Sequence, residues 1–99
     1  MYQIHFSIGV HTDLKTIPIY YRKRILDTIE KQLTHRPTAV TRNKKILINL
    51  TPPWETISPI WELRIEDYRV FYDIDEQEKM VVIRAIRHKP PEKTTEEIL

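Results

Sequence analysis

The sequence contains no cysteine and a single glycine, and each scarcity excludes several classes of protein. Without cysteine there is no disulfide framework, no thiolate nucleophile and no cysteine-ligated zinc. Walker-type phosphate loops and dinucleotide-binding turns need several glycines so that backbone N–H groups can approach a phosphate, whereas Gly9 stands alone. Any phosphate that this protein binds must therefore be held by side chains.

Long apolar runs are also missing. No stretch approaches the roughly 18 apolar residues of a membrane span, and the start, MYQIHFSIGVHTDL, lacks the basic and apolar regions of a signal peptide. The chain has 99 residues, of which 40% are hydrophobic and 30% are charged, as in an ordinary globular protein. We therefore expect one soluble, cytoplasmic domain spanning residues 1–99.

The net charge is only +2, but the charge is unevenly distributed. Residues 1–50 carry nine Lys or Arg and three Asp or Glu, whereas residues 51–99 carry seven and eleven. Between Lys31 and Trp54 there are five basic residues and no acidic one, including Arg42, Lys44 and Lys45. Such a segment is either a footprint for a polyanion or a solvated loop.

Hydrophobic periodicity predicts a strand followed by two helices. Residues 2–8 alternate between apolar and polar and are rich in aromatic and β-branched types, which is typical of a strand. A four-residue spacing of Tyr21, Ile25, Ile29 and Leu33 then predicts an amphipathic helix that begins near Pro18 and ends before Pro37. Leu14 and Ile17 indicate a shorter helix before it.

The rest of the chain predicts a small β-meander. Residues 35–59 form an ordered excursion, because the apolar residues of its central run KILINL need burial: Ile46, Leu47, Ile48 and Leu50. Three strands follow at about 60–66, 68–75 and 79–88, and Thr94 with Glu97 has the spacing of a capping box for one final helical turn. The predicted fold class is α+β, in the order β-α-α-β-β-β, with two N-terminal helices packed on a small, mainly antiparallel sheet.

Alternation along these strands sorts their side chains into two faces, provided that no β-bulge intervenes. One face is apolar and is expected to pack on the helices. The other combines charged and apolar residues, which is typical of a concave, half-covered surface rather than a fully solvated one: Glu62, Arg64, Arg69, Phe71, Val82, Arg84, Ile86 and His88.

Each basic residue of this second face can either form a structural ion pair or bind an anion. Arg64 can pair with Glu62 or Glu66, and Arg84 can pair across strands with Asp73. Arg69 lies in the middle of the meander, where an unpaired charge is costly, so it is the first candidate for an anion site. His88, between Arg87 and Lys89, is a candidate for proton transfer near neutral pH. His5, His11 and His35 show no metal-ligand spacing, so we expect no metal site.

The run WELRIEDYRVFYDID, followed by VVIRAIRHK, resembles the RelE/ParE superfamily of toxins from bacterial toxin–antitoxin systems. The likeness lies in an L-R-I-x-x-Y-R-V-x-Y strand pair, the acidic turn after it and a last strand that closes on a His-basic pair. The helix YYRKRILDTIEKQL and the loop RPTAVTRNKKIL also occupy the positions usual for the family, so the resemblance covers nearly the whole chain.

This resemblance implies a type II toxin with a small, probably acidic antitoxin as its partner, and with no cofactor or metal. The RelE branch cleaves mRNA in the ribosomal A site, where the 2′-hydroxyl attacks the adjacent phosphate, and the ParE branch poisons DNA gyrase. For the cleavage reaction, the resemblance gives Arg69 the phosphate-stabilising role and His88 an acid/base role, with Glu62 as a candidate base. The residues expected to hold RNA are Arg64, Arg84, Arg87 and Lys89, with Arg42, Lys44 and Lys45 extending the footprint.

The chain departs from the RelE pattern at two places. Ile60 and Glu62 stand where RelE enzymes usually carry lysines, and the tail PPEKTTEEIL lacks their late tyrosine. Ribosome-dependent mRNA cleavage is the leading hypothesis. The alternatives are a gyrase poison without a hydrolytic site and a degenerate toxin that only binds its antitoxin.

Overall fold

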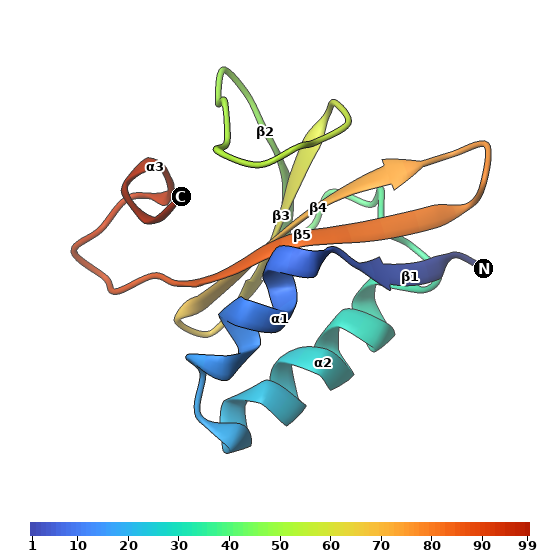
Figure 1. The fold of residues 1–99 in the computed structure, drawn as a ribbon. Helices are drawn as coiled ribbons and strands as arrows, with labels where there is room; N and C mark the ends of the chain where they lie inside the picture. Colours follow the sequence, from blue (N-terminus) through green and yellow to red (C-terminus); the bar gives the residue numbers. More distant parts are fainter.

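The computed structural model describes all 99 residues and contains one five-stranded sheet with two helices on one of its faces (Figure 1). The elements in chain order are β1 (Gln3–Phe6), α1 (Ile8–Lys15), α2 (Ile19–Leu33), β2 (Lys44–Leu47), β3 (Ile60–Ile65), β4 (Tyr68–Asp75), β5 (Met80–His88) and α3 (Thr95–Ile98). The sheet order is β1-β5-β4-β3-β2, and only the β1–β5 pair is parallel. This confirms the predicted α+β fold class. None of the helices combines the length and apolar character needed to span a membrane.

The core lies between α2 and the sheet. The predicted helical stripe is buried at Ile25, Ile29 and Leu33, whereas Tyr21 is still about one-third exposed. The helix packs on the apolar residues of the three long strands, which include Leu63, Val70, Tyr72, Val81 and Ile83. Burial of each large apolar side chain stabilises the fold by roughly 1.5–3 kcal/mol, so this layer supplies most of the driving force.

The excursion between α2 and β3 contains a strand that was not predicted. Residues 44–47 pair antiparallel with β3 as strand β2, at the edge of the sheet. The prediction that the whole apolar run KILINL needs burial is wrong, because Ile46 is 40% exposed and Ile48 is 80% exposed. The predicted C-terminal turn is confirmed as α3, with a complete capping box between Thr94 and Glu97.

A β-bulge in β5 changes the predicted sorting of its side chains. Phe71 pairs with Ala85 and Tyr72 pairs with Ile83, so Arg84 is an extra residue in the ladder. Beyond this bulge the alternation is inverted, as expected when one residue is inserted. His88 therefore pairs with Tyr68 on the helix-facing side, and Arg87 pairs with Arg69 on the other side. The prediction that His88 and Ile86 share a face with Arg69 is wrong.

The buried Tyr72 hydroxyl donates a hydrogen bond to the Pro37 carbonyl oxygen at 2.7 Å and links the sheet to the end of the helical layer. Burial raises the pKa of Tyr72 above the ordinary tyrosine value. The neutral form is thus favoured in the folded state, whereas the unfolded chain ionises this residue near pH 10. Stability from this group is fully present below about pH 10 and is lost as the pH rises further.

We expect Tyr72→Phe to lower the free energy of unfolding by about 1 kcal/mol at pH 7, through loss of one hydrogen bond. Above pH 10 the free energy of unfolding of the wild type should fall by about 1.4 kcal/mol per pH unit through ionisation of Tyr72 in the unfolded chain. The variant lacks this group and should not show this fall. The stability difference should therefore vanish and then reverse, as followed by urea unfolding from pH 7 to pH 11. A constant difference across this range would contradict the assignment.

Candidate functional site

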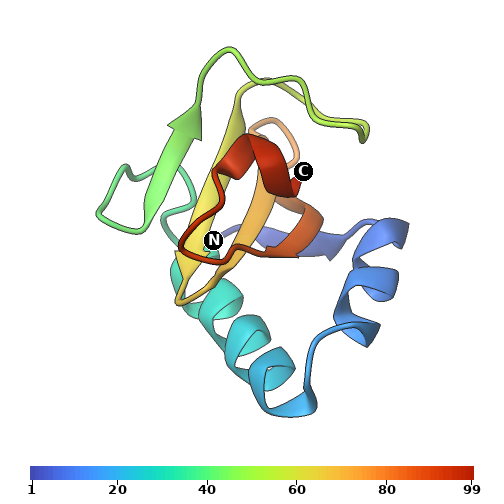
Figure 2. The ribbon, with the colours of Figure 1, turned by 90° about the vertical axis from the view of Figure 1, so that its left-hand side faces the viewer.

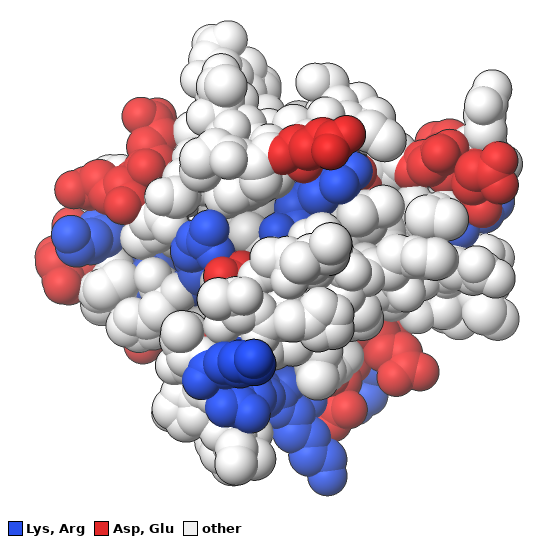
Figure 3. Space-filling view, in the orientation of Figure 1, with Lys and Arg blue, Asp and Glu red and all other residues white.

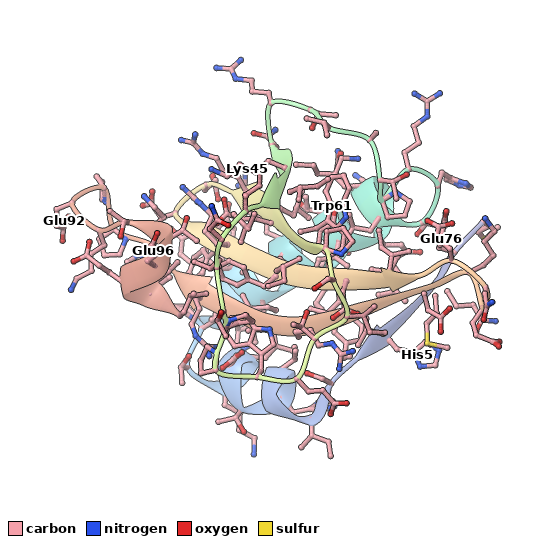
Figure 4. All side chains as sticks on the ribbon, turned by 90° about the horizontal axis from the view of Figure 1, so that it is seen from above. His5, Lys45, Trp61, Glu76, Glu92 and Glu96 are labelled. Carbon is pink, nitrogen blue, oxygen red and sulfur yellow. The ribbon has the colours of Figure 1, made fainter.

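The face of the sheet opposite the helices is divided into a covered part and an open part. Figure 4 looks onto this face, which the loop between β2 and β3 crosses, with Lys45 on β2 and α3 with its Glu96 at one end. In the covered part, the Trp54 ring lies 5.4 Å from the Phe71 ring, measured between centroids. The Arg87 guanidinium lies 5.3 Å from the centroid of Trp54. The loop thus closes the apolar portion of this face.

Asp73 anchors this loop. Its fully buried carboxylate accepts hydrogen bonds from the Thr56 hydroxyl at 2.9 Å and from the Ile57 backbone N–H at 3.0 Å. The same carboxylate forms an ion pair with Arg84, with 2.7 Å between Nε and Oδ2. Arg84 therefore stabilises the fold through Asp73, which is the cross-strand pairing that the sequence offered as an alternative to RNA binding. It does not line the open part.

The open part is a polar cleft of about 230 Å³ without any apolar lining residue. Its lining residues come from β2 and the two residues before it, from β3 and β4, from the residue after β5 and from α3, which Figure 2 shows in front of β3 and β4. Its lining residues are Arg42, Asn43, Lys45, Glu62, Arg64, Arg69, Lys89 and Thr95. We call this the basic cleft, because five of these eight residues are cations and only one is an anion.

Arg69 is fixed at the floor of the basic cleft. Its side chain is buried, and its Nη1 donates to the carbonyl oxygens of Glu66 at 2.8 Å and Tyr68 at 2.9 Å. Burial lowers the pKa of Arg69, and the Glu62 carboxylate acts in the opposite direction. An arginine nevertheless stays protonated in proteins. The two carbonyls orient the guanidinium through Nη1 alone, so its other nitrogens are available to an anion.

Arg69 is the centre of a row of like charges. It pairs directly with Arg64 on β3 and with Arg87 on β5. Arg87 is neutralised by Asp13, with 2.8 Å between Nη1 and Oδ1, but Arg64 is exposed and has no ion pair, because Glu66 pairs with Arg24 instead. Like charges directly opposite on a sheet are destabilising. An anion in the basic cleft would relieve this repulsion.

Glu62 is the only carboxylate of the basic cleft, and it is 4% exposed. Its Oε2 accepts a hydrogen bond from the Thr95 hydroxyl at 2.8 Å, and its Oε1 lies 3.7 Å from Lys45 Nζ. Glu62 and Arg69 both lie on the open face, on neighbouring strands. The cleft thus combines one buried proton acceptor with several fixed positive charges, a set suited to activating a hydroxyl next to a phosphate.

The structure brings together six of the ten predicted site residues and separates the other four. Arg42, Lys45, Glu62, Arg64, Arg69 and Lys89 line the basic cleft. Arg84 and Arg87 are engaged by Asp73 and Asp13 as described above, and they lie outside the cleft.

Lys44 corrects a prediction, because it is buried and faces away from the basic cleft. Its ammonium donates to the carbonyl oxygens of Gln32 at 3.2 Å and Arg36 at 2.8 Å, at the end of α2. Burial lowers the pKa of Lys44, and the nearby Arg36 cation lowers it further. The Gln32 carbonyl lies in the last turn of α2, where the helix leaves it without an intrahelical partner, and the Arg36 carbonyl lies just beyond the helix. The ammonium is thus directed toward these two carbonyls and away from the basic cleft.

His88 corrects another prediction. The imidazole lies edge-on to Tyr68, with 5.3 Å between ring centroids, in a hollow that it shares with Tyr21, Glu66 and Asp67. It does not line the basic cleft. No three histidine, aspartate or glutamate side chains gather in a metal-ligating cluster.

Sequence reasoning missed two lining residues. Asn43 lies inside the one-signed basic segment, so the charge pattern indicated its neighbourhood. Thr95 carried no such signal, because its bond to Glu62 joins residues that are 33 positions apart.

The fold is similar to that of chains in several solved toxin and toxin–antitoxin structures. The toxin–antitoxin complex RelBE2 from Mycobacterium tuberculosis contains a chain with 22% identity and a TM-score of 0.68, covering 89% of this chain and 98% of that chain. The isolated E. coli RelE toxin has 12% identity and a TM-score of 0.68, covering 98% and 94%. A chain of the archaeal RelE–RelB complex from Pyrococcus horikoshii has 21% identity and a TM-score of 0.62, covering 94% and 98%. At these identities the likeness shows the fold alone.

The family follows from the sequence. The family model for the ParE toxin of type II toxin–antitoxin systems, parDE, matches residues 4–89. A search of curated protein sequences returned no match. The chain therefore belongs to the ParE toxin family, within the RelE/ParE superfamily, and it is the toxin component of a type II toxin–antitoxin system.

Proposed function

We propose that this toxin inhibits translation by cutting mRNA on the ribosome without a metal ion. The observation that carries this proposal is the basic cleft, in which five cations surround the single buried carboxylate of Glu62. A surface that only bound a protein would benefit from apolar side chains at its centre, and no apolar residue lines this cleft. An anionic substrate with a hydroxyl to be activated fits it better.

In the proposed reaction, Glu62 takes the proton of a ribose 2′-hydroxyl, and the resulting oxygen attacks the adjacent phosphorus. The bond from phosphorus to the 5′-oxygen of the next nucleotide then breaks, which yields a cyclic 2′,3′-phosphate and a free 5′-hydroxyl. A positioned general base of this kind typically contributes about 10²–10⁴-fold in rate. Burial of Glu62 beside Arg69 keeps water away from the carboxylate.

The cations of the basic cleft act on the charge that develops at phosphorus. Arg69 is oriented before substrate arrives, so it stabilises the charged intermediate without reorganising. Arg64 and Arg42 extend the contact along the RNA backbone. A guanidinium does not release its proton, so Lys45 or Lys89 protonates the leaving 5′-oxygen.

Arg69→Ala tests this function directly. In cell-free translation, the wild type should block synthesis and leave mRNA cut at codons, whereas the variant should cleave about 10²–10³-fold more slowly. Circular dichroism verifies that the variant is folded. Lys23→Ala removes an exposed cation of α2 whose side chain makes no hydrogen bond or ion pair, so it serves as the control and should act like the wild type. Full inhibition by Arg69→Ala would exclude Arg69 from the mechanism.

The second candidate is a gyrase poison, which the resemblance to the ParE branch implies. The matching family model describes ParE toxins, and His88 lies outside the basic cleft, which removes one acid/base candidate. A DNA supercoiling assay with purified gyrase separates the two functions. Inhibited supercoiling together with intact mRNA in translation reactions would replace the nuclease proposal with this one.

We also propose a small, acidic antitoxin as the cognate partner. Solved relatives include toxin–antitoxin complexes. The basic cleft offers complementary charge. A groove of about 420 Å³ between β1 and α2, lined by Ile4, Phe6, Leu26 and Ile29 among others, offers apolar surface. An amphipathic acidic segment could use both surfaces.

A further inference from the structure

The C-terminal segment, residues 90–99, crosses the end of the sheet and touches the basic cleft through one side chain. Its start is tied down by the Lys89 N–H, which donates to the Asp67 carbonyl oxygen at 2.6 Å. Further along, the Thr95 hydroxyl donates to Glu62 at 2.8 Å, and this is the segment's only hydrogen bond from a side chain to the sheet. Helix α3 has no fully buried residue, and Ile98 is its only half-buried apolar side chain.

The short helix presents Thr95 in a defined position. Four residues are too few for a helix to be stable alone, and a capping box supports this one. The Thr94 hydroxyl accepts from the Glu97 N–H at 3.3 Å, and the Glu97 carboxylate accepts from the Thr94 N–H at 2.8 Å. These bonds lower the pKa of Glu97. Thr95 follows the cap directly, so the box determines where its hydroxyl lies.

The charge of the segment is opposite to that of the basic cleft. Glu92, Glu96 and Glu97 outweigh Lys93, and Figure 3 shows acidic side chains gathered at the α3 end of the molecule. None of these carboxylates forms an ion pair with a cleft cation, so the attraction between them acts through space. Such an attraction holds the segment near the basic cleft only weakly, because solvent and salt screen interactions between exposed charges.

We propose that this C-terminal segment, residues 90–99, is a substrate-mimicking strap, in which the Thr95 hydroxyl occupies on Glu62 the position that the RNA 2′-hydroxyl would take. This inference rests on the proposed function, because the mimicry requires Glu62 to be the base. Each hydroxyl donates its hydrogen to the same carboxylate, so both cannot bind at once. The strap must open for RNA to enter, and the negative charge that holds it near the cleft repels RNA while it is closed.

Two variants of the full chain open the strap by different routes. Thr95→Val removes the hydroxyl that reaches Glu62 and keeps the side-chain shape. Thr94→Ala leaves Thr95 intact but removes the cap that positions it. Thr12→Val makes the same change as the first variant at an exposed position of α1 whose hydroxyl makes no hydrogen bond, so it is the matched control.

Binding is measured by fluorescence anisotropy with a labelled RNA dodecamer that keeps its 2′-hydroxyls. The proposed cleavage requires the ribosome, and a gel verifies that the free RNA stays intact during the measurement. Cleavage is measured separately, by mapping mRNA ends in translation reactions. We expect Thr95→Val and Thr94→Ala to bind the RNA about 2- to 10-fold more tightly than the wild type, the range that one lost hydrogen bond allows, and to cleave faster. Thr12→Val should match the wild type in both assays.

The outcomes separate this inference from the proposed function. If no protein cleaves mRNA but both opening variants still bind the RNA more tightly, the nuclease proposal fails and the strap stands as a cover of an RNA-binding cleft. The strap proposal is overturned if both variants bind the RNA as the wild type does or more weakly. It is also overturned if none of the proteins binds the RNA. Slower cleavage by Thr95→Val with unchanged binding would also overturn it, by making Thr95 an aid to catalysis.

Discussion

Glu62→Gln should slow mRNA cleavage by about 10²–10⁴-fold, because glutamine cannot accept the proton of the 2′-hydroxyl at neutral pH. The amide has nearly the shape of the carboxylate, and its oxygen can still accept the Thr95 hydrogen bond. The nearby Lys45 is 62% exposed, so its ion pair with Glu62 contributes little to stability. The substitution should therefore affect chemistry far more than folding.

Cleavage rates on programmed ribosomes and thermal melts measure these two effects. Glu55→Gln changes an exposed glutamate in the β2–β3 loop whose carboxylate makes no hydrogen bond or ion pair, and it should leave both quantities unchanged. A Glu62→Gln protein that cuts mRNA at the wild-type rate would show that another group removes the proton. Loss of RNA binding together with loss of cleavage would instead assign Glu62 to shaping the cleft.

Asp73→Ala should lower the free energy of unfolding by about 3–5 kcal/mol, the cost of leaving one member of a buried ion pair alone. Arg84 is only 16% exposed, so water cannot fully replace its partner. The Thr56 hydroxyl and the Ile57 N–H lose their acceptor at the same time. The loop that places Trp54 on Phe71 should then detach from the sheet.

Urea unfolding gives the free energy of unfolding. In a Trp61→Phe background, where Trp54 is the only tryptophan, the fluorescence of Trp54 reports detachment of the loop. Asp27→Ala removes an exposed aspartate of α2 and should change stability by no more than about 0.5 kcal/mol. Asp73→Ala combined with Arg84→Met should recover part of the loss, because the double change leaves no buried charge without a partner. A loss below about 1 kcal/mol for Asp73→Ala would mean that the pair is already compensated by solvent.

Local sequence patterns determined much of the fold. The four-residue spacing of Ile25, Ile29 and Leu33 predicted the buried stripe of α2, and alternation located the three long strands to within about a residue. Strand β2 escaped prediction, because an edge strand of four residues whose one isoleucine is exposed has little periodicity to detect. Its pairing with β3 is a long-range event.

The family was recognisable from the strand pair around Arg69, because those residues serve the core and the site together. Arg69 was also the strongest candidate for an anion site, and it lies at the floor of the basic cleft. Arg69 lies in β4, ahead of the β5 bulge in the chain, so simple alternation of side chains predicted its face correctly. The same reasoning placed Glu62 on the same face.

Only the tertiary structure decided which of the other charged residues belong to the site. A bulge is a property of how two strands pair, so the sequence could not show which face the end of β5 would present. In the structure, Arg87 shares the face of Arg69, whereas His88 lies on the opposite face. The burial of Lys44 required the end of α2 to lie beside β2. The Thr95–Glu62 contact required α3 to fold back over the sheet. Periodicity reports which face of an element is apolar, but contacts between distant elements arise only when the chain packs.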